Sequence, residues 1–383
     1  MELSRICEYT SRRIDSSSLT VDNYISTENM VQNKGGVVAA SKVPTEKAIE
    51  FSPGDVLVSN IRPYFKKIWL ADKRGGCSSD VLCIRALPGT DSTYLYYLLA
   101  QDAFFEYVMT GAKGSKMPRG DKSQIMQWVI NLPGIDEQRR VASILKSIDD
   151  KITLNNRINH NLEEQAQALY KSWFVDYEPF KDGGLVDSEL GMIPKGWDIR
   201  ALGEVTREIR NKVGTRHDVR VLSPITTGRL VLSEEYFTKQ VYSESISKYL
   251  IVQPQEFAYN PARVNIGSIG KNNYDFDGCV SPVYVVFRCE SGYELFFDLY
   301  RRTEPFKDEV VSRSNGGVRQ TLGYKDFALI KLVYPPESVV ASFNDLYMGL
   351  LNGMAHCSDE NSFLAEQRDI LLPKLMSGEI TVD

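Results

Sequence analysis

The sequence predicts a mixed α/β (α+β) protein in which a globular head followed by a long helix occurs twice, with the two long helices forming an antiparallel coiled coil. The first observation behind this prediction is an internal repeat, in which matched segments recur at an offset of about 202 residues. The second is that each copy ends in a stretch whose apolar residues alternate in steps of three and four, the pattern of a coiled-coil helix.

The repeat consists of seven matched pairs of segments that occur in the same order in both halves. Seven ordered matches at a nearly constant offset exceed what chance would produce, so we interpret the chain as two copies of one unit. The pairs are Pro53–Leu57 with Pro254–Ala258, Arg62 with Arg263, Gly76–Ser79 with Gly278–Ser281, Val81–Arg85 with Val283–Arg288, Tyr94–Leu98 with Tyr293–Phe297, Leu132–Pro133 with Tyr334–Pro335, and Glu164–Gln165 with Glu366–Gln367.

The first head is expected over residues 1–135. Its β-branched and aromatic runs, separated by Gly and Pro, predict strands at Val56–Val58, Lys67–Leu70 and Val81–Ile84, and Tyr94–Met109 reads as a helix.

The first long helix is expected over residues 136–182. It follows Pro133 and Gly134 and begins with Asp136 and Glu137, acidic residues that complement the positive end of a helix dipole. About 40 helical residues would span roughly 60 Å. The predicted seam, polar in its middle, is Val141, Leu145, Ile148, Ile152, Asn155, Asn159, Leu162, Ala166, Leu169 and Trp173.

A linker is expected over 183–196, because this stretch is rich in Gly, Pro and acidic residues. The second head is expected over 197–336, with a strand at Val283–Phe287 and a helix at Leu295–Val311.

The second long helix and a tail are expected over 337–383. Gly349 and Gly353 weaken this helix, and Pro373 should end or kink it. The seams are expected to bury each other, although each helix packing on its own head is the alternative. The second seam is Phe343, Tyr347, Leu350, Met354, Cys357, Asn361, Leu364, Arg368, Leu371 and Leu375.

Composition narrows the possible functions. The N-terminal residues lack the apolar core of a signal peptide, and no apolar run approaches the roughly 18 residues of a membrane span, so a cytoplasmic protein without membrane contact is expected. None of the six cysteines forms a C-x-x-C pair, which argues against zinc and favours buried, reduced thiols. The net charge of -5 does not fit a protein that coats DNA alone, but local groups of Lys and Arg can still bind phosphate.

Basic and amide side chains on predicted turns are the candidate DNA contacts, because Arg pairs with guanine, Asn and Gln pair with adenine, and Lys binds phosphate. A solvated loop charge is the alternative for each of them, and a buried ion pair is a further alternative for the matched Arg62 and Arg263. The candidates in the first head are Asn60, Arg62, Lys66, Lys67, Lys113, Lys116 and Arg119; those in the second are Asn260, Arg263, Lys271, Arg313, Asn315, Arg319 and Gln320.

The sequence shows no pattern expected of a catalytic or metal site. The nearest string to an adenine methyltransferase motif, Asn260-Pro261-Ala262-Arg263, lacks the second proline and the aromatic residue. No phosphate-binding loop of the G-x-x-x-x-G-K-S/T form is present, and none of the three histidines lies near a second one.

Several segments resemble the specificity subunits of type I restriction-modification systems. Leu132–Arg140 resembles the family's Leu-Pro-x-x-x-Glu-Gln signature, and Ala168–Tyr177 resembles its helix end. Gly191–Trp197 resembles the entry to its second recognition domain, and Glu366–Ile380 its C-terminus. One departure is Glu337-Ser338, which stands where the second Glu-Gln pair would be and predicts a less regular helix start.

The resemblance implies two target-recognition domains that read the halves of an interrupted DNA site, with the coiled coil setting the unread spacer. It also implies partners: double-stranded DNA, two methyltransferase subunits, and restriction subunits that act as motor and nuclease. S-adenosylmethionine, ATP and magnesium would belong to those partner subunits, leaving this chain non-catalytic and without a cofactor. The rival readings are an adaptor that spaces two protein-binding domains and a single-chain DNA methyltransferase or nuclease.

Overall fold

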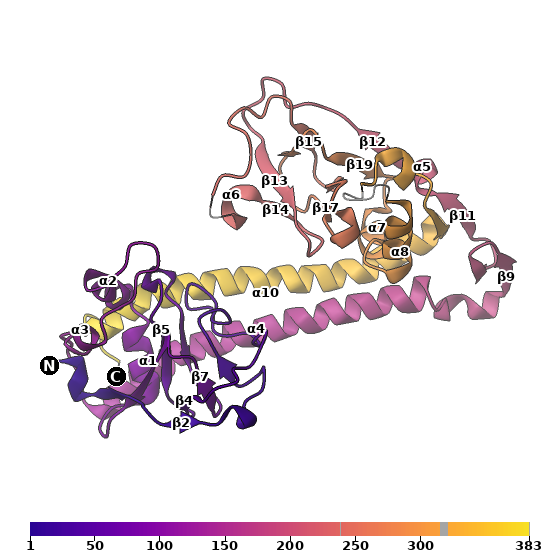
Figure 1. The fold of residues 1–383 in the computed structure, drawn as a ribbon. Helices are drawn as coiled ribbons and strands as arrows, with labels where there is room; N and C mark the ends of the chain where they lie inside the picture. The colour runs from indigo at the N-terminus through magenta and orange to yellow at the C-terminus, as the bar shows by residue number, and fades with distance from the viewer. Residues whose placement is uncertain (238, 315–320, 383) are drawn as a thin grey trace. The chain divides into compact units, whose positions relative to one another are not determined.

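The computed structural model describes residues 1–237, 239–314 and 321–382. The chain divides into two compact units: unit 1 comprises Met1–Ile158 and His356–Asp383, and unit 2 comprises Asn159–Ala355. Each unit contains one head and parts of two long helices, α4 (Ile135–Phe174) and α10 (Glu337–Ser377) (Figure 1). Strands and helices occur together in both units, so the mixed α/β class is confirmed.

The head of unit 1 contains two four-stranded sheets. The first sheet is antiparallel, whereas the second contains one parallel pair, between β3 and β7. In spatial order, the first sheet is β1 (Cys7–Tyr9), β8 (Val81–Ala86), β5 (Val56–Ser59) and β6 (Ile68–Leu70), and the second is β2 (Arg13–Ile14), β4 (Ala48–Phe51), β7 (Gly75–Cys77) and β3 (Tyr24–Ile25).

The head of unit 2 also contains two four-stranded sheets, and it adds two two-stranded sheets. Its two larger sheets are β12 (Thr206–Ile209), β19 (Val285–Cys289), β16 (Phe257–Tyr259) and β17 (Ile269–Lys271), and β14 (Leu230–Leu232), β13 (Arg220–Pro224), β18 (Gly278–Val280) and β15 (Leu250–Val252). The small sheets pair β9 (Leu185–Ser188) with β10 (Gly191–Pro194), and β11 (Asp198–Ala201) with β20 (Lys331–Tyr334). The predicted linker therefore contains a hairpin.

The two heads share the strand order of one sheet and three strands of the other, in which the outer strand differs: β2 lies beside β4, whereas β14 lies beside β13. This shared order is the structural counterpart of the sequence repeat. β1-β8-β5-β6 corresponds to β12-β19-β16-β17, and the parallel pair β3–β7 corresponds to β13–β18. Close packing explains why both matched positions, 76 and 278, are glycine. A Cβ on Gly76 would lie 2.8 Å from the Cβ of Ala48, and a Cβ on Gly278 would lie 2.3 Å from Leu222 Cδ1. No larger side chain fits at either position.

The same pattern of short helices follows the sheets in both heads. The helix predicted over Tyr94–Met109 is two helices, because Gln101 is extended and the chain turns there to bury Phe104 and Phe105 in the core. The helix predicted over Leu295–Val311 is divided in the same way. The short helices are α1 (Ser92–Leu99), α2 (Asp102–Thr110) and α3 (Lys122–Met126) in unit 1, and α5 (Leu202–Val205), α6 (Ser233–Tyr236), α7 (Glu294–Tyr300), α8 (Glu304–Arg313) and α9 (Tyr324–Phe327) in unit 2.

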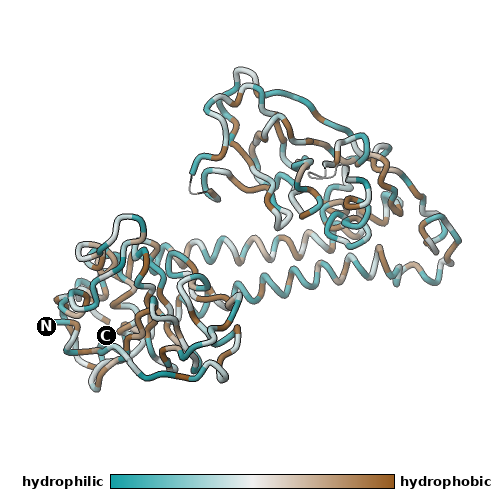
Figure 2. The backbone as a smooth tube through the Cα atoms, viewed as in Figure 1, coloured by the Kyte–Doolittle hydropathy of each residue, from teal (hydrophilic) through white to brown (hydrophobic). Residues whose placement is uncertain are grey.

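The long helices pack against each other in both units, and they do so antiparallel. In unit 1, Asp149 pairs with Arg368 at 2.8 Å and Asn155 with Asn361 at 3.0 Å, so residue numbers rise along α4 as they fall along α10. In unit 2, Leu162 faces Gly353. The ring centroids of Trp173 and Phe343 lie 5.9 Å apart. All seam positions predicted on α4 are buried or half-buried, and apolar segments recur along both helices in Figure 2.

The long helices also pack on the heads. The start of each one packs on its own head, as in the alternative arrangement: Val141 of α4 lies in the core of the first head, and Phe343 of α10 lies in the core of the second. Val141 and Leu145 of α4 share one apolar core with Leu372 and Leu375 of α10 and with Leu3 of the first head. Pro373 was expected to end or kink the helix, and it does not end it. Leu372 and Leu375 on either side of the proline are buried, which offsets its missing hydrogen bond, and α10 continues to Ser377.

The first helix ends earlier than predicted. Tyr177 has a left-handed backbone, and Pro179 cannot continue an α-helix, so α4 stops at Phe174 and a 3-10 turn, η4 (Glu178–Gly183), follows. The second helix starts regularly at Glu337, which corrects the expectation of an irregular start.

A glutamine fixes the start of α4. Gln138 is 1% exposed; its Oε1 accepts from the amide of Asp91, and its Nε2 donates to the carbonyls of Gly89 and Pro133. In this way one side chain ties the helix to the turn that precedes α1.

In unit 2 two residues together make the equivalent bonds. The hydroxyl of Tyr293 donates to the Pro335 carbonyl at 2.9 Å, and Asn344 Nδ2 donates to the Gly292 carbonyl at 2.7 Å. The missing Glu-Gln pair is thus replaced by different side chains that bond the matched carbonyls.

Candidate nucleic-acid interface

Three segments of unit 1 meet at the end of β5. The 3-10 turn η3 (Pro63–Phe65) follows β5, the Arg62 amide before it donates to the carbonyl of Pro118, and the amides of Asn33 and Lys34 donate to the carbonyls of Phe65 and Lys66. We call residues 31–36, 60–67 and 113–119 the loop surface of unit 1. It brings together all the candidates predicted in the first head.

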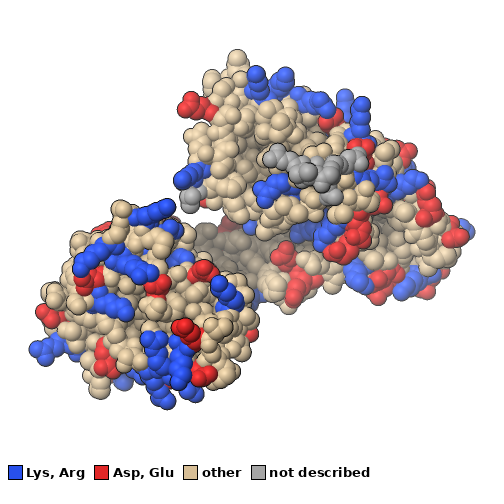
Figure 3. Space-filling model, in the orientation of Figure 1, with Lys and Arg blue, Asp and Glu red and all other residues tan. Residues whose placement is uncertain are grey.

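The loop surface is basic. Lys34 belongs to it as well, which sequence reasoning missed because only the fold brings residues 31–36 beside η3. Seven cations lie beside three carboxylates: Lys34, Arg62, Lys66, Lys67, Lys113, Lys116 and Arg119, with Asp80, Asp102 and Asp121. On the face drawn in Figure 3, Lys and Arg form local groups among Asp and Glu on each unit, which is how an acidic chain can still present basic surfaces.

Four of these cations have carboxylate partners. Lys34 and Lys66 both pair with Asp102, at 3.2 and 2.8 Å, and the other two pairs are Lys113 with Asp121 and Arg119 with Asp80, each at 3.0 Å. Within the described residues, the remaining three cations form no such pair: Arg62, Lys67 and Lys116.

Asn60 does not behave as the predicted DNA contact. It is 8% exposed, its backbone bonds to Asp80 and Gly120, and Gly120 approaches its side chain so closely that a Cβ there would lie 2.9 Å from Asn60 Oδ1. Asn60 therefore lies beneath the loop surface and connects its segments through backbone hydrogen bonds.

The candidates of unit 2 divide between surface and interior. Arg263 is exposed and precedes the 3-10 turn η5 (Val264–Ile266), which follows β16 as η3 follows β5. Lys271 is 5% exposed and donates to Gln255 Oε1 at 2.8 Å, so its assignment as a DNA contact is wrong. Burial lowers the pKa of Lys271.

The other candidates of unit 2 are less accessible or are not described. Asn260 is half-buried, and its Oδ1 accepts from the amide of Ala262. Arg313 pairs with Glu309 at the end of α8, at 2.7 Å. Three predicted residues lie outside the described residues: Asn315, Arg319 and Gln320.

The alternative of a shared buried ion pair at Arg62 and Arg263 is wrong. The duplicated ion pair lies elsewhere: the buried carboxylate of Asp55 accepts two hydrogen bonds from Arg85, and the buried carboxylate of Glu256 accepts two from Arg288. These pairs fix the turns that begin β5 and β16.

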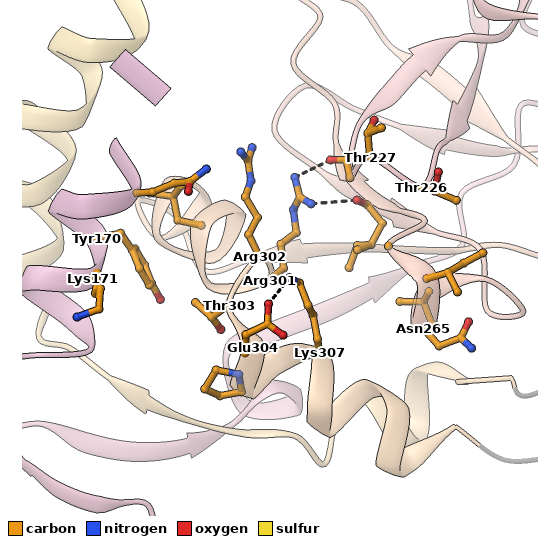
Figure 4. A pocket seen from close by; sticks show the side chains of 18 of the residues that line it. Tyr170, Lys171, Thr226, Thr227, Asn265, Arg301, Arg302, Thr303, Glu304 and Lys307 are labelled. Carbon is orange, nitrogen blue, oxygen red and sulfur yellow. Dashed lines mark hydrogen bonds and ion pairs between the residues drawn. The ribbon is translucent and has the colours of Figure 1, made fainter. Parts of the chain in front are cut away.

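A cavity of about 950 Å³ in unit 2 lies between α4, η5 and the junction of α7 with α8 (Figure 4). Its buried Arg301 binds Asp298 and the carbonyls of Gly228 and Ile269, which ties the β13–β14 turn to β17. Arg302 pairs with Asp298 at 3.0 Å. The other two cations that line the cavity also have carboxylate partners: Lys307 pairs with Glu304, and Lys171 pairs with Asp176. Because carboxylates balance its cations, this cavity supports the β13–β14 turn and does not present a free cation for an anion among the described residues.

Three further observations concern metals, thiols and membranes. Among the residues that the structure describes, no three His, Cys, Asp or Glu side chains are placed to hold a metal ion. The six cysteines are free and buried, as the sequence predicted. Within the same ranges, no helix has both the length and the apolar composition needed to cross a bilayer.

Comparison with known proteins gives consistent similarities. Residues 1–164 match the family described as type I restriction modification DNA specificity domain. The type I restriction enzyme HindI specificity subunit of Haemophilus influenzae is 23% identical, over 99% of this chain and 98% of that protein. The MjaIX specificity subunit of Methanocaldococcus jannaschii is 28% identical, over 77% and 70%. The crystal structure of a type I S subunit from M. genitalium shares the fold, with a TM-score of 0.59 at 15% identity, over 98% of this chain and 95% of that one.

Proposed function

Since this chain belongs to the specificity subunits of type I restriction-modification systems, whose part is to recognise a DNA sequence, we propose that its two heads each read one half of an interrupted site. The observation that carries this proposal is the duplication. Both heads have the same strand order in one four-stranded sheet, and in each an arginine precedes a 3-10 turn after matched strands, β5 and β16. Two copies of one reading unit on one chain suit a site with two separate halves.

The long helices would set the unread spacer. Their antiparallel packing in each unit makes them a stiff connection, and DNA presents the same face every 10–10.5 base pairs, about 34–36 Å.

The chemistry would belong to partner subunits. We propose that the chain itself is non-catalytic and assembles in the cytoplasm with two methyltransferase subunits, and with restriction subunits in the complete enzyme. Those partners would supply the S-adenosylmethionine, ATP and magnesium sites, and a target adenine would flip into the methyltransferase. The acidic total of the chain supports a subunit that grips DNA together with its partners.

An adenine-methylation map tests this function. DNA from cells that express the chain with its methyltransferase partner is compared with DNA from cells that express the partner alone. We expect a two-part motif with an unread gap only when this chain is present. A complex that co-purifies but adds no methylation would favour the adaptor reading.

Separate variants test whether each head reads only one half of the site. Lys116→Ala should relax the methylated motif only in one half, and Arg263→Ala only in the other, because each mismatched base pair is worth about 1–3 kcal/mol and is read locally. If either variant relaxes both halves equally, the two-head assignment is wrong.

A further inference from the structure

The three cations of the loop surface without carboxylate partners are not equivalent. Lys116 is exposed, whereas Arg62 and Lys67 are half-buried and lie around one ring. The guanidinium carbon of Arg62 is 6.0 Å from the centre of the Phe65 ring, and the ammonium of Lys67 is 5.9 Å from it.

The backbone holds Arg62 in a fixed place. Its φ of 51° is left-handed, its amide donates to Pro118, and it begins η3. Its Nε is enclosed by protein and has no hydrogen-bond partner among the described residues. An incoming anion would therefore meet the exposed part of this half-buried side chain and not its Nε.

Lys67 is held against Arg62 in spite of its like charge. Its Nζ donates to the carbonyl of Thr27 at 2.7 Å, which leaves its other donors unused by any bond in the described residues. Burial and the positive charge of Arg62 lower the pKa of Lys67. An anion placed between the two cations would therefore stabilise both.

We propose that Arg62 and Lys67 together bind one backbone phosphate of DNA beside the first half-site. The inference rests on the proposed function and deepens it: this contact fixes the position of the first head on the duplex and reads no base. A phosphate has several anionic acceptor oxygens and can satisfy two converging cations, whereas a guanine edge satisfies one arginine.

The neighbouring cations do not serve this purpose as well. Lys34 and Lys66 share the single carboxylate of Asp102, so binding a phosphate there would compete with existing ion pairs. In the part of the second head that the structure describes, the same pair is not present, because the position that matches Lys67 is the buried Ser268 and the one that matches Phe65 is Ile266. Among the described residues, Arg263 thus has no second cation at the matched position, and we assign the phosphate site to the first head.

The test uses the complete chain assembled with its methyltransferase subunits. The variants are Arg62→Asn, since Asn tolerates the left-handed backbone, and Lys67→Gln. Lys73→Gln is the matched control: it removes a lysine that also lies 5.9 Å from a ring centre, that of Trp69, but beyond the other end of β6. Affinity is measured against salt on two duplexes, one with the mapped site and one with its first half scrambled.

Each variant should weaken both duplexes by the same factor, about tenfold, and should lower the slope of log affinity against log salt by about 0.9. The methylated motif should stay unchanged, and Lys73→Gln should behave as the unaltered chain. An unchanged salt slope, or a motif relaxed at one base position, would overturn the proposal.

A scan with uncharged methylphosphonates locates the contact. One substitution beside the first half should weaken the unaltered complex and should weaken Arg62→Asn no further, and no such coupling should appear for Arg263→Asn. Absence of coupling at every phosphate would contradict the inference. Failure of the proposed function itself would be seen differently, as an unaltered complex with no sequence preference.

Discussion

At the scale of single residues, the two units keep the same backbone carbonyls hydrogen-bonded but use different side chains as the donors. Gln138 bonds the carbonyls of Gly89 and Pro133 alone, whereas Tyr293 and Asn344 share the matching carbonyls in unit 2. A duplicated unit can therefore exchange the donor as long as each buried carbonyl keeps one, because an unsatisfied buried group costs about 1–3 kcal/mol.

Gln138→Ala should lower the free energy of unfolding of unit 1 by about 2–4 kcal/mol, because it leaves the Asp91 amide and two carbonyls without partners. Urea unfolding measures this loss. Gln165→Ala is the control, since Gln165 is exposed on the same helix and donates to Asn161 within the same surface; its effect should stay within about 0.5 kcal/mol. Equal losses in the two variants would contradict a special role for Gln138.

The candidate site could be predicted only in part, because the sequence does not show whether a polar side chain at a strand end is buried or exposed. Residue type and turn position led to Arg62 and Arg263, which do begin turns after matched strands. The same reasoning chose Asn60 and Lys271, which the fold buries, because a polar residue next to a strand end can face either side. Lys34 was missed because a hydrogen bond to Lys66, far along the chain, places it.

At the scale of elements, the middle of the coiled coil in unit 1 is polar. Asn155, 1% exposed, donates to Asn361 and to Glu360, and Lys151 pairs with Glu360 at 3.2 Å. A buried asparagine in a seam fixes register and partner, and it lowers stability relative to an apolar residue.

Replacing both Asn155 and Asn361 by Leu should raise the free energy of unfolding of unit 1 by about 1–2 kcal/mol, because a well-packed apolar pair replaces a polar one. Thermal or urea unfolding of the complete chain checks this value. Asn161→Leu, at an exposed position of α4, serves as the control and should change stability little. A loss of stability in the double variant would show that the polar contacts are net stabilising.

The seam was the most predictable element. Spacing in steps of three and four fixes which face of a helix is apolar, so all ten positions predicted on α4 are buried or half-buried. The ends of elements were less predictable, because they depend on tertiary packing: Ala100 and Gln101 interrupt one expected helix, while the core around Pro373 carries another through a proline.

At the scale of the whole molecule, the proposed spacer role can be tested by length. Seven residues that continue each seam are inserted after Ile158 and after Ala355, where the two units meet along the chain. About 10 Å of added helix should lengthen the unread spacer by up to about three base pairs and leave both halves of the methylated motif unchanged. A spacer of unaltered length would show that the coiled coil does not set it.

The composition of unit 1 has a consequence for the order of synthesis. Its core combines Leu3 and Leu145 with Leu372, Leu375 and Met376, so it needs residues that the ribosome adds only after the whole of Asn159–Ala355. Unit 2 is continuous in sequence and can fold as soon as it emerges. Domains usually complete folding from the N-terminus during translation. Here the head that is synthesised first completes its folding last, and part of its apolar core stays uncovered until the end of α10 has been synthesised.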